Sequence, residues 1–245
     1  MKIISLPTTE STNTHLSSIA AEAEEYTVVN AEAQTAGRGQ RGNSWEAEPG
    51  KNLTFSILLK PEHILAADQF IISQAVSVAI AGVLAKKVKN AGEVAVKWPN
   101  DIYVDNQKIC GILIENSLLG SKIRYSIVGV GLNVNQKDFK SDAPNPVSLI
   151  HITGEETDRA ALLDEICSAI SRCMDATKTE TGKKDIVAMY KSCIWRREGE
   201  HKYRIPGGEN FRAEIVDIAS SGHITLRDTD GKDRIFAFKE VQYIL

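Results

Sequence analysis

Residues 37–42 read GRGQRG and place three glycines and two arginines between two strand-like segments, 26–34 and 52–61. Glycine is costly in regular structure, so this cluster indicates a special backbone geometry or the close approach of a ligand. A glycine-rich loop exposes backbone N–H groups, and arginine adds a planar fork of donors that suits phosphate or carboxylate. The loop therefore predicts an anion site, although a flexible connection with solvated arginines explains the loop alone equally well.

A second set of reactive side chains lies in KWPND at 97–101 and in NQKICGILIE at 106–115. Asp101 stands at the end of one strand, and Lys108 emerges from the next strand after a tight turn. A carboxylate and an ammonium on adjacent strands can hold a magnesium-bound phosphate beside a reacting carboxylate. Taken singly, Lys97 or Lys108 is more simply explained as a solvated strand lysine.

The segment VGVGLNVN at 128–135 has Gly129 and Gly131 on one face of an apolar strand, with Asn133 at its end. Two glycines on one face leave room for a ligand against the sheet, but a close-packed strand crossing would need the same residues. The polar triplet at 11–13, Ser-Thr-Asn, is by itself most simply a helix cap.

The composition places these motifs in a globular chain. The 245 residues are 42% hydrophobic and 25% charged, with a net charge of -3, so no overall basic field favours DNA. We expect no membrane association, because no signal peptide is visible and the apolar stretch 70–85 is short and interrupted by polar residues. The chain is predicted to be cytoplasmic. The four cysteines form no C-x-x-C pair, so we expect reduced, structural thiols.

The hydrophobic periodicity predicts an α+β fold with a mixed, mostly antiparallel sheet flanked by helices. Helices are expected over 11–25, 63–90, 158–178 and 183–194, and the helix 63–90 should be buried against the sheet. Short alternating runs separated by S-G and D-G turns follow near the C-terminus. We therefore expect one large domain at 1–195, which carries the motifs above, and a small β-barrel domain at 196–245.

The motifs AEAQTAGRGQRGNSW, KWPNDI, KICGILIE and VGVGLNVN occur in the order and spacing of biotin protein ligases, which the whole chain resembles. The resemblance is to the monofunctional form without the N-terminal DNA-binding domain. It implies an enzyme that joins biotin to ATP as biotinyl-5'-AMP, with Mg²⁺, and passes the biotinoyl group to a lysine. The implied partner is the biotin carboxyl carrier protein domain of a carboxylase. Which carboxylase is served, and whether the chain forms a homodimer, stay open.

The resemblance also assigns roles to individual residues. Arg38, Asp101 and Lys108 are the implied catalytic residues: Arg38 covers the acyl-adenylate, Lys108 bridges carboxylate and phosphate, and Asp101 assists the incoming lysine and binds magnesium through the phosphates. The implied biotin-binding residues are Ser11, Thr12, Asn13, Gln34, Gly37, Arg38, Gly111 and Gly129. The implied ATP- and adenylate-binding residues are Gly39, Gln40, Arg41, Gly42, Trp45, Lys97, Asn100, Lys108, Gly131 and Asn133.

The chain departs from the family pattern at two places. It ends FKEVQYIL, which keeps Glu240 but lacks the Gly-Glu-x-Ser-Leu-Arg ending, so a contact from the C-terminal domain to ATP or to the carrier is in doubt. The adenine-stacking tryptophan after VGVGLNVN is also missing, and Phe139 or a neighbouring aliphatic residue is expected to cover the adenine instead.

Two alternative functions remain. Lipoate protein ligases and octanoyltransferases share the architecture, but their Arg-Arg-x-Ser-Gly-Gly-Gly loop does not occur in this sequence. A non-catalytic biotin binder would require a broken adenylation set, whereas Arg38, Asp101 and Lys108 are all present.

Gln40 gives a first testable prediction. Biotin protein ligases often carry arginine at this point of the loop, and glutamine keeps hydrogen-bond donors but loses the positive charge. We expect Gln40→Arg to slow the release of biotinyl-adenylate by at most about tenfold, the effect of one partly solvated ion pair. Protein loaded with biotin and ATP and freed of excess ligand would be followed over time. Equal release from both proteins would contradict the prediction.

Overall fold

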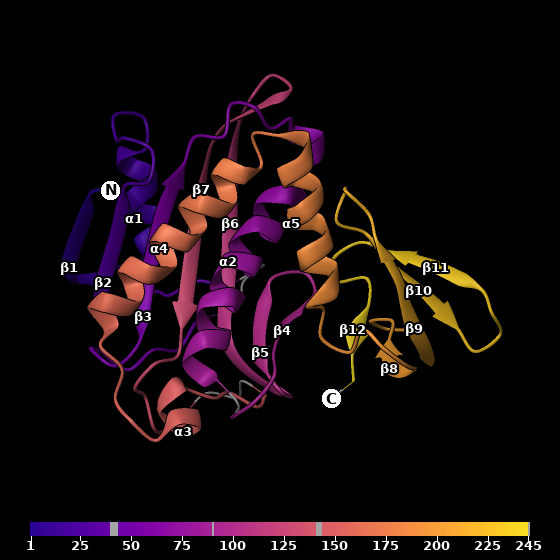
Figure 1. Ribbon diagram of the computed structural model, residues 1–245. Coiled ribbons are helices and arrows are strands. Elements are labelled where there is room, and N and C mark those ends of the chain that lie inside the picture. Colours follow the sequence, from indigo (N-terminus) through magenta and orange to yellow (C-terminus); the bar gives the residue numbers. More distant parts are fainter. Residues whose placement is uncertain (40–43, 90, 141–143, 245) are drawn as a thin grey trace.

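The computed structural model describes residues 1–39, 44–89, 91–140 and 144–244. Its main feature is a seven-stranded sheet in the order β1-β2-β3-β7-β6-β5-β4, in which β1 pairs with β2 in parallel and all other neighbours are antiparallel (Figure 1). The mixed, mostly antiparallel sheet predicted from the sequence is confirmed. The strands are β1 (Ile3–Thr9), β2 (Val28–Gln34), β3 (Leu53–Leu59), β4 (Val94–Lys97), β5 (Asp101–Val104), β6 (Gln107–Leu119) and β7 (Lys122–Leu132).

Helices cover the two faces of this sheet unequally (Figure 1). One face packs on α2 (Phe70–Val88), α4 (Arg159–Ala176) and α5 (Glu180–Ser192), which form the large core with Ile112, Val128 and Val130. The other face packs on the short helix α1 (Thr12–Ile19) through a small cluster that includes Ile127. Because strand residues alternate between faces, Gly129 and Gly131 share the α1 face with Ile127.

Helix α2 is the central core element. Most of its residues are buried, as the sequence predicted, although it begins at Phe70 after a 3-10 turn, η2 (Ala66–Asp68), and not at 63. The segment Ala66–Val88 is long and apolar enough to cross a membrane, but most of it is buried inside this fold. Its apolar composition is therefore accounted for by packing against the sheet.

The other helices differ from their predicted ranges mainly at the ends. Helix α1 stops at Ile19, well before the predicted end at 25, and α4 begins after Asp158, whose side chain accepts hydrogen bonds from two backbone N–H groups of the first turn. A short helix, α3 (Leu149–Thr153), was not predicted; it follows Ser148 and ends at Gly154, which has the positive φ that favours glycine.

The C-terminal segment forms a second sheet in the order β11-β10-β9-β8-β12. The sequence predicted a small β-barrel here; the strands are present, but they form an open sheet, because no pairing joins the two edge strands among the described residues. Strand β12 has only two residues and pairs with β8 alone, so it is too short to close the ring. The strands are β8 (His201–Arg204), β9 (Asn210–Ile218), β10 (Ile224–Asp228), β11 (Asp233–Phe236) and β12 (Gln242–Tyr243).

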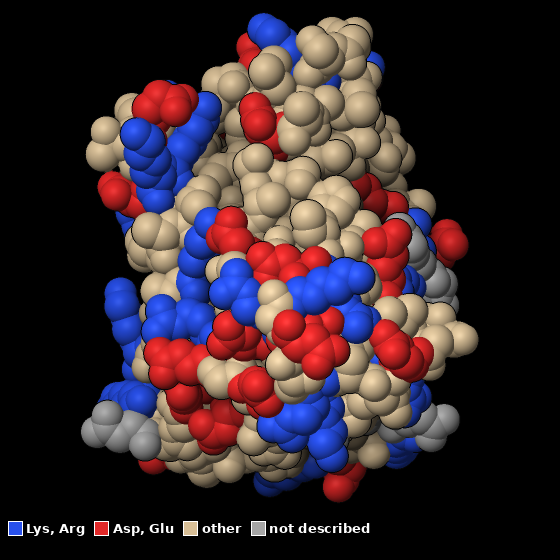
Figure 2. Space-filling view, turned by 90° about the vertical axis from the view of Figure 1, so that its right-hand side faces the viewer, with Lys and Arg blue, Asp and Glu red and all other residues tan. Residues whose placement is uncertain are grey.

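Charged residues of the C-terminal sheet pair with one another. Ion pairs join Arg234 to Glu209 at 2.5 Å and Arg227 to Asp233 at 2.8 Å. On the side of the molecule seen in Figure 2, basic and acidic side chains interleave over the lower half and again at the upper left, while the upper centre is largely uncharged. This face does not present the one-sign patch that nonspecific nucleic-acid binding requires.

The two sheets are joined beside β4. Ile194 forms a parallel bridge with Val96 of β4. The chain therefore runs along the edge of the first sheet before it enters the second. The indole N–H of Trp98 donates to the Gly222 carbonyl at 2.9 Å, and the Trp98 ring meets Phe238 edge-on with centroids 6.0 Å apart. Trp98 therefore ties the strand end that carries KWPND to the C-terminal sheet.

We expect Trp98→Phe to lower the free energy of unfolding by about 1 kcal/mol more than Trp45→Phe, because only Trp98 loses a hydrogen bond. The indole N–H of Trp45 is buried without a partner among the described residues. Urea unfolding of both variants measures the difference. Equal losses would show that the Trp98 bond to Gly222 contributes nothing to stability.

Candidate active site

A cavity of about 1040 Å³ opens on the α1 face of the large sheet. Of the predicted site residues that the structure describes, all but Gly37 line it; Gln40, Arg41 and Gly42 lie outside the described residues. Elements far apart in sequence therefore meet at one place. The predicted residues on the cavity wall are Ser11, Thr12, Asn13, Gln34, Arg38, Gly39, Trp45, Lys97, Asn100, Asp101, Lys108, Gly111, Gly129, Gly131 and Asn133.

One end of the cavity is a buried polar network. The Thr12 backbone N–H donates to Gln34 Oε1 at 2.8 Å, and the Thr12 hydroxyl lies 3.2 Å from the same oxygen. The Ser56 hydroxyl lies 2.7 Å from Thr12 Oγ1 and 2.6 Å from Asn13 Oδ1. The Ser11 side chain caps no N–H group within the described part of the chain, so helix capping does not account for this triplet. The network presents both donors and acceptors to a small polar ligand.

Ser56 is a residue that the sequence analysis missed. It is fully buried in β3 and pairs in register with Gly129. The available signal was a hydroxyl inside the apolar run NLTFSILLKP, since a buried hydroxyl needs a hydrogen-bond partner.

The glycines of β6 and β7 allow side chains to lie directly on the sheet. A Cβ at Gly129 would overlap Asn13, and one at Gly131 would overlap the Trp45 ring. A Cβ at Gly111 would come within 3.1 Å of that ring. These glycines are needed because α1 and the segment after residue 43 close on the strands, so the alternative of a strand crossing does not apply.

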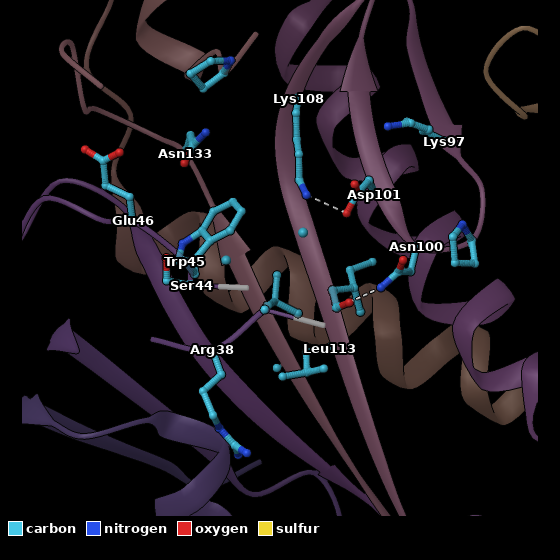
Figure 3. A pocket seen from close by; sticks show the side chains of 18 of the residues that line it. Arg38, Ser44, Trp45, Glu46, Lys97, Asn100, Asp101, Lys108, Leu113 and Asn133 are labelled. Atoms are coloured by element: carbon cyan, nitrogen blue, oxygen red, sulfur yellow. Dashed lines mark hydrogen bonds and ion pairs between the residues drawn. The ribbon is translucent and has the colours of Figure 1, made fainter. Parts of the chain in front are cut away.

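The Lys108 ammonium lies 2.8 Å from an Asp101 carboxylate oxygen (Figure 3). The two side chains come from β6 and β5, where a register shift between Ile102 and Tyr103 brings Lys108 beside Tyr103 and Asp101 beside Gly111. Lys108 is also held by its backbone, which donates to Asn145 and accepts from Val147. Lys108 is therefore a half-buried lysine in an ion pair, and the simpler interpretation as a solvated strand lysine does not apply to it.

Lys97 and the glycine-bearing strands β6 and β7 lie on opposite sides of Asp101 (Figure 3). Its ammonium lies 3.1 Å from the Tyr103 hydroxyl and within 6 Å of two ring centroids, at 5.0 Å for Tyr103 and 5.6 Å for Tyr243. Burial lowers the pKa of Lys97, an effect that the carboxylate of Asp101 opposes. Lys97 is therefore a desolvated cation at the cavity wall.

Two buried asparagines frame the same region. Asn100 donates from its side chain to the Ile112 carbonyl, while the Asn133 side chain donates to the Val147 carbonyl at 3.0 Å. Asn133 Oδ1 is buried without a partner among the described residues, as is the Trp45 indole N–H. An orphaned acceptor and an orphaned donor beside one cavity are the groups that a bound ligand would satisfy.

Pro99, between Trp98 and Asn100, is held from the helical side of the sheet. Its carbonyl accepts from the Tyr190 hydroxyl at 2.9 Å and from the Ser73 hydroxyl at 3.3 Å. Tyr190 comes from α5 and Ser73 from α2, so these two helices fix the strand end that leads into Asp101. The available signal for this role of Tyr190 was its hydroxyl on the apolar face of a helix.

The C-terminal segment also reaches the cavity. Phe238, Lys239, Val241, Gln242 and Tyr243 contribute to its wall, so the second sheet borders the site even though the family's terminal arginine is absent. Phe139 lies on the wall as well, with its ring centroid 6.2 Å from that of His151.

No three His, Cys, Asp or Glu side chains gather into a metal site within the described residues. Asp101 can offer one carboxylate oxygen to a metal whose other ligands are substrate phosphates and water, as is usual for Mg²⁺. The four cysteines are free, and burial raises the pKa of the Cys110 thiol, which suits a structural role.

Comparison with known proteins places this geometry in a family. The model of the biotin/lipoate A/B protein ligase family matches residues 5–133. The bifunctional ligase/repressor BirA of Bacillus spizizenii is 33% identical over 219 residues, 88% of this chain and 66% of that protein. The alignment thus spans slightly less than two thirds of the Bacillus protein. The biotin–[acetyl-CoA-carboxylase] ligase of Paracoccus denitrificans is 33% identical over 172 residues, 68% of this chain and 70% of that protein.

Solved structures agree over nearly the whole chain. The biotin protein ligase of Aquifex aeolicus in complex with biotin and ATP superposes with a TM-score of 0.81 at 25% identity and covers 99% of both chains. The biotin protein ligase of Leishmania major in complex with biotinyl-5-AMP has a TM-score of 0.68 at 22% identity over 96% of this chain and 98% of that one, a likeness of fold. With more than half of its length matched by the family model, the chain belongs to the biotin/lipoate A/B protein ligase family.

Proposed function

We propose that this chain is an ATP-dependent biotin protein ligase that forms biotinyl-5'-AMP and transfers the biotinoyl group to a lysine of a carrier domain. The observation that carries the proposal is a single cavity with the Thr12–Gln34 network at one end and the Lys108–Asp101 pair at the other. The relatives matched over most of their own length, from Paracoccus and Aquifex, carry the same activity in their names.

The first step joins two anions. The biotin carboxylate attacks the α-phosphate of ATP, a new C–O–P linkage forms, and the bond to pyrophosphate breaks. Negative charge gathers between the reactants, so an ammonium placed there lowers the barrier. Lys108 is the proposed group at this point, with Arg38 and backbone N–H groups of the glycine-rich segment around the adenylate. Lys97 lies where it can bind the polyphosphate.

The second step is attack of the carrier lysine on the acyl carbon, which forms an amide and releases AMP. A lysine amine with its usual pKa of about 10.4 is neutral only in roughly one part per thousand near pH 7, so it needs a proton acceptor. As Lys108 turns from Asp101 toward phosphate, the Asp101 carboxylate becomes available to take that proton.

The polar end suits the ureido ring of biotin. Hydroxyl and amide groups of Ser11, Thr12, Asn13 and Gln34 offer donors and acceptors in a buried site, and the glycine face of the strands leaves space for the thiophane ring. Asn100, Asn133 and Trp45 lie nearer the Lys108 end and are assigned to the nucleotide. Magnesium enters as a substrate ion on the ATP phosphates, with Asp101 as its protein contact.

The wider assignments stay predictions. We assign 1–195 to the ligase domain and 196–245 to the smaller domain that borders the cavity. The proposed protein substrate is the biotin carboxyl carrier domain of a biotin-dependent carboxylase, the type of enzyme named for the Paracoccus relative. We also propose a cytoplasmic location, and a homodimer stays a prediction.

One experiment separates this function from its alternatives. The protein is mixed with MgATP, a carrier domain, and either biotin or lipoate, and the carrier is weighed by mass spectrometry. Mass gain with biotin alone supports the proposal. Gain with lipoate alone would identify a lipoate ligase, and no gain together with biotin binding would identify a non-catalytic binder.

We expect Lys108→Ala to slow biotin-dependent ATP–pyrophosphate exchange by about 100- to 1000-fold, because the lysine acts on charge that develops in the transition state. Lys87→Ala is the matched control: Lys87 pairs with Glu165 at 2.6 Å and has nearly the same exposure as Lys108, but it lies on α2 outside the cavity. Exchange within threefold of wild type in Lys108→Ala would remove Lys108 from the mechanism.

A further inference from the structure

Glu115 joins two parts of the cavity through one carboxylate oxygen. Its Oε2 accepts from Asn13 Nδ2 at 2.7 Å and from Arg38 Nη2 at 3.1 Å. Glu115 follows Gly111 and Leu113 on β6, and these alternate residues share one face of the strand. A buried amide of α1 and the arginine of the glycine-rich segment are therefore linked by a residue with no role in the function proposed above.

The Arg38 side chain is directed away from the reacting end of the cavity. In Figure 3 its guanidinium points away from the Lys108–Asp101 pair, although Arg38 belongs to the cavity wall. Its backbone is fixed by a bridge to Ser44, next to the bond from Trp45 N–H to the Gly37 carbonyl. With the backbone held, rotation of the side chain decides which anion the guanidinium contacts.

The Arg38–Glu115 pair is easily exchanged. The two side chains are 46% and 42% exposed, and an ion pair this accessible to water adds little stability. A guanidinium binds carboxylate and phosphate with two parallel hydrogen bonds, so an acyl-adenylate is a strong competitor. Asn13 is buried and also bonded to Ser56, so it keeps its place and continues to hold Glu115 when Arg38 leaves.

We propose that Glu115 is a positioning residue that acts as a competing counter-ion for Arg38. Glu115 is held in place by Asn13 and binds the Arg38 guanidinium near the polar end of the cavity. When the anionic adenylate is present, the guanidinium leaves Glu115 and binds the adenylate. The competition weakens retention of the adenylate, which favours its passage to the carrier lysine. This inference rests on the proposed ligase function.

The test is a double-mutant cycle between Glu115 and Arg38. Glu115→Gln removes the competing charge with little change in shape, and release of biotinyl-adenylate from loaded protein should slow by up to about tenfold. In an Arg38→Ala background the same substitution should leave the release rate unchanged. Glu32→Gln is the matched control, because Glu32 is 46% exposed and pairs at 2.9 Å with Arg159, which does not line the cavity, whereas the partner of Glu115, Arg38, does; Glu32→Gln should release adenylate like wild type.

The outcomes are distinguishable. Wild-type release from Glu115→Gln, or an equal change with and without Arg38, would overturn the inference, since a merely structural effect of Glu115 does not depend on Arg38. Wild-type protein that makes no adenylate would overturn the ligase function and this inference with it. Slower release that disappears in Arg38→Ala supports the competition.

Discussion

The pairing of β5 with β6 holds an ammonium and a carboxylate 2.8 Å apart at the wall of a cavity, and the rest of the site is arranged around that pair. The charges of Lys108 and Asp101 neutralise each other in this structure, which lowers the free-energy cost of burying half of each charged side chain at the same place. In the proposed mechanism an anion draws the Lys108 ammonium away from Asp101, so the lysine and the carboxylate become available together. The same pair can thus serve both an attack on phosphate and an attack by an amine.

The large core secures the backbone that carries this pair. The carbonyl of Pro99 accepts hydrogen bonds from helices α2 and α5, and Trp98 binds the C-terminal sheet on its other side. The short segment KWPND is therefore fixed from two layers. Fixed geometry is what an electrostatic mechanism requires, because donors that must reorganise during the reaction contribute less.

The open C-terminal sheet has a defined part in the site. Its edge strand β12 contributes Tyr243, which packs on Trp195 and Tyr203 and lies near the Lys97 ammonium. This packing brings residues 238–243 to the cavity wall. The absence of the family's terminal arginine from the sequence had left a role for this segment in doubt.

The motifs with alternating glycines, the charged pair and the apolar helix could be recognised in the sequence because strand and helix periodicity are local properties, and the motif order then led to the family. Local sequence patterns could not show that Glu115 links Asn13 to Arg38, because this contact joins distant parts of the chain. The support that Ser56 and Tyr190 give to the site was not visible for the same reason. The open C-terminal sheet was hidden for the same reason: local alternation predicts strands, but only tertiary packing decides which edges pair. The sequence determined which groups could do the chemistry, and the fold decided which atoms they contact.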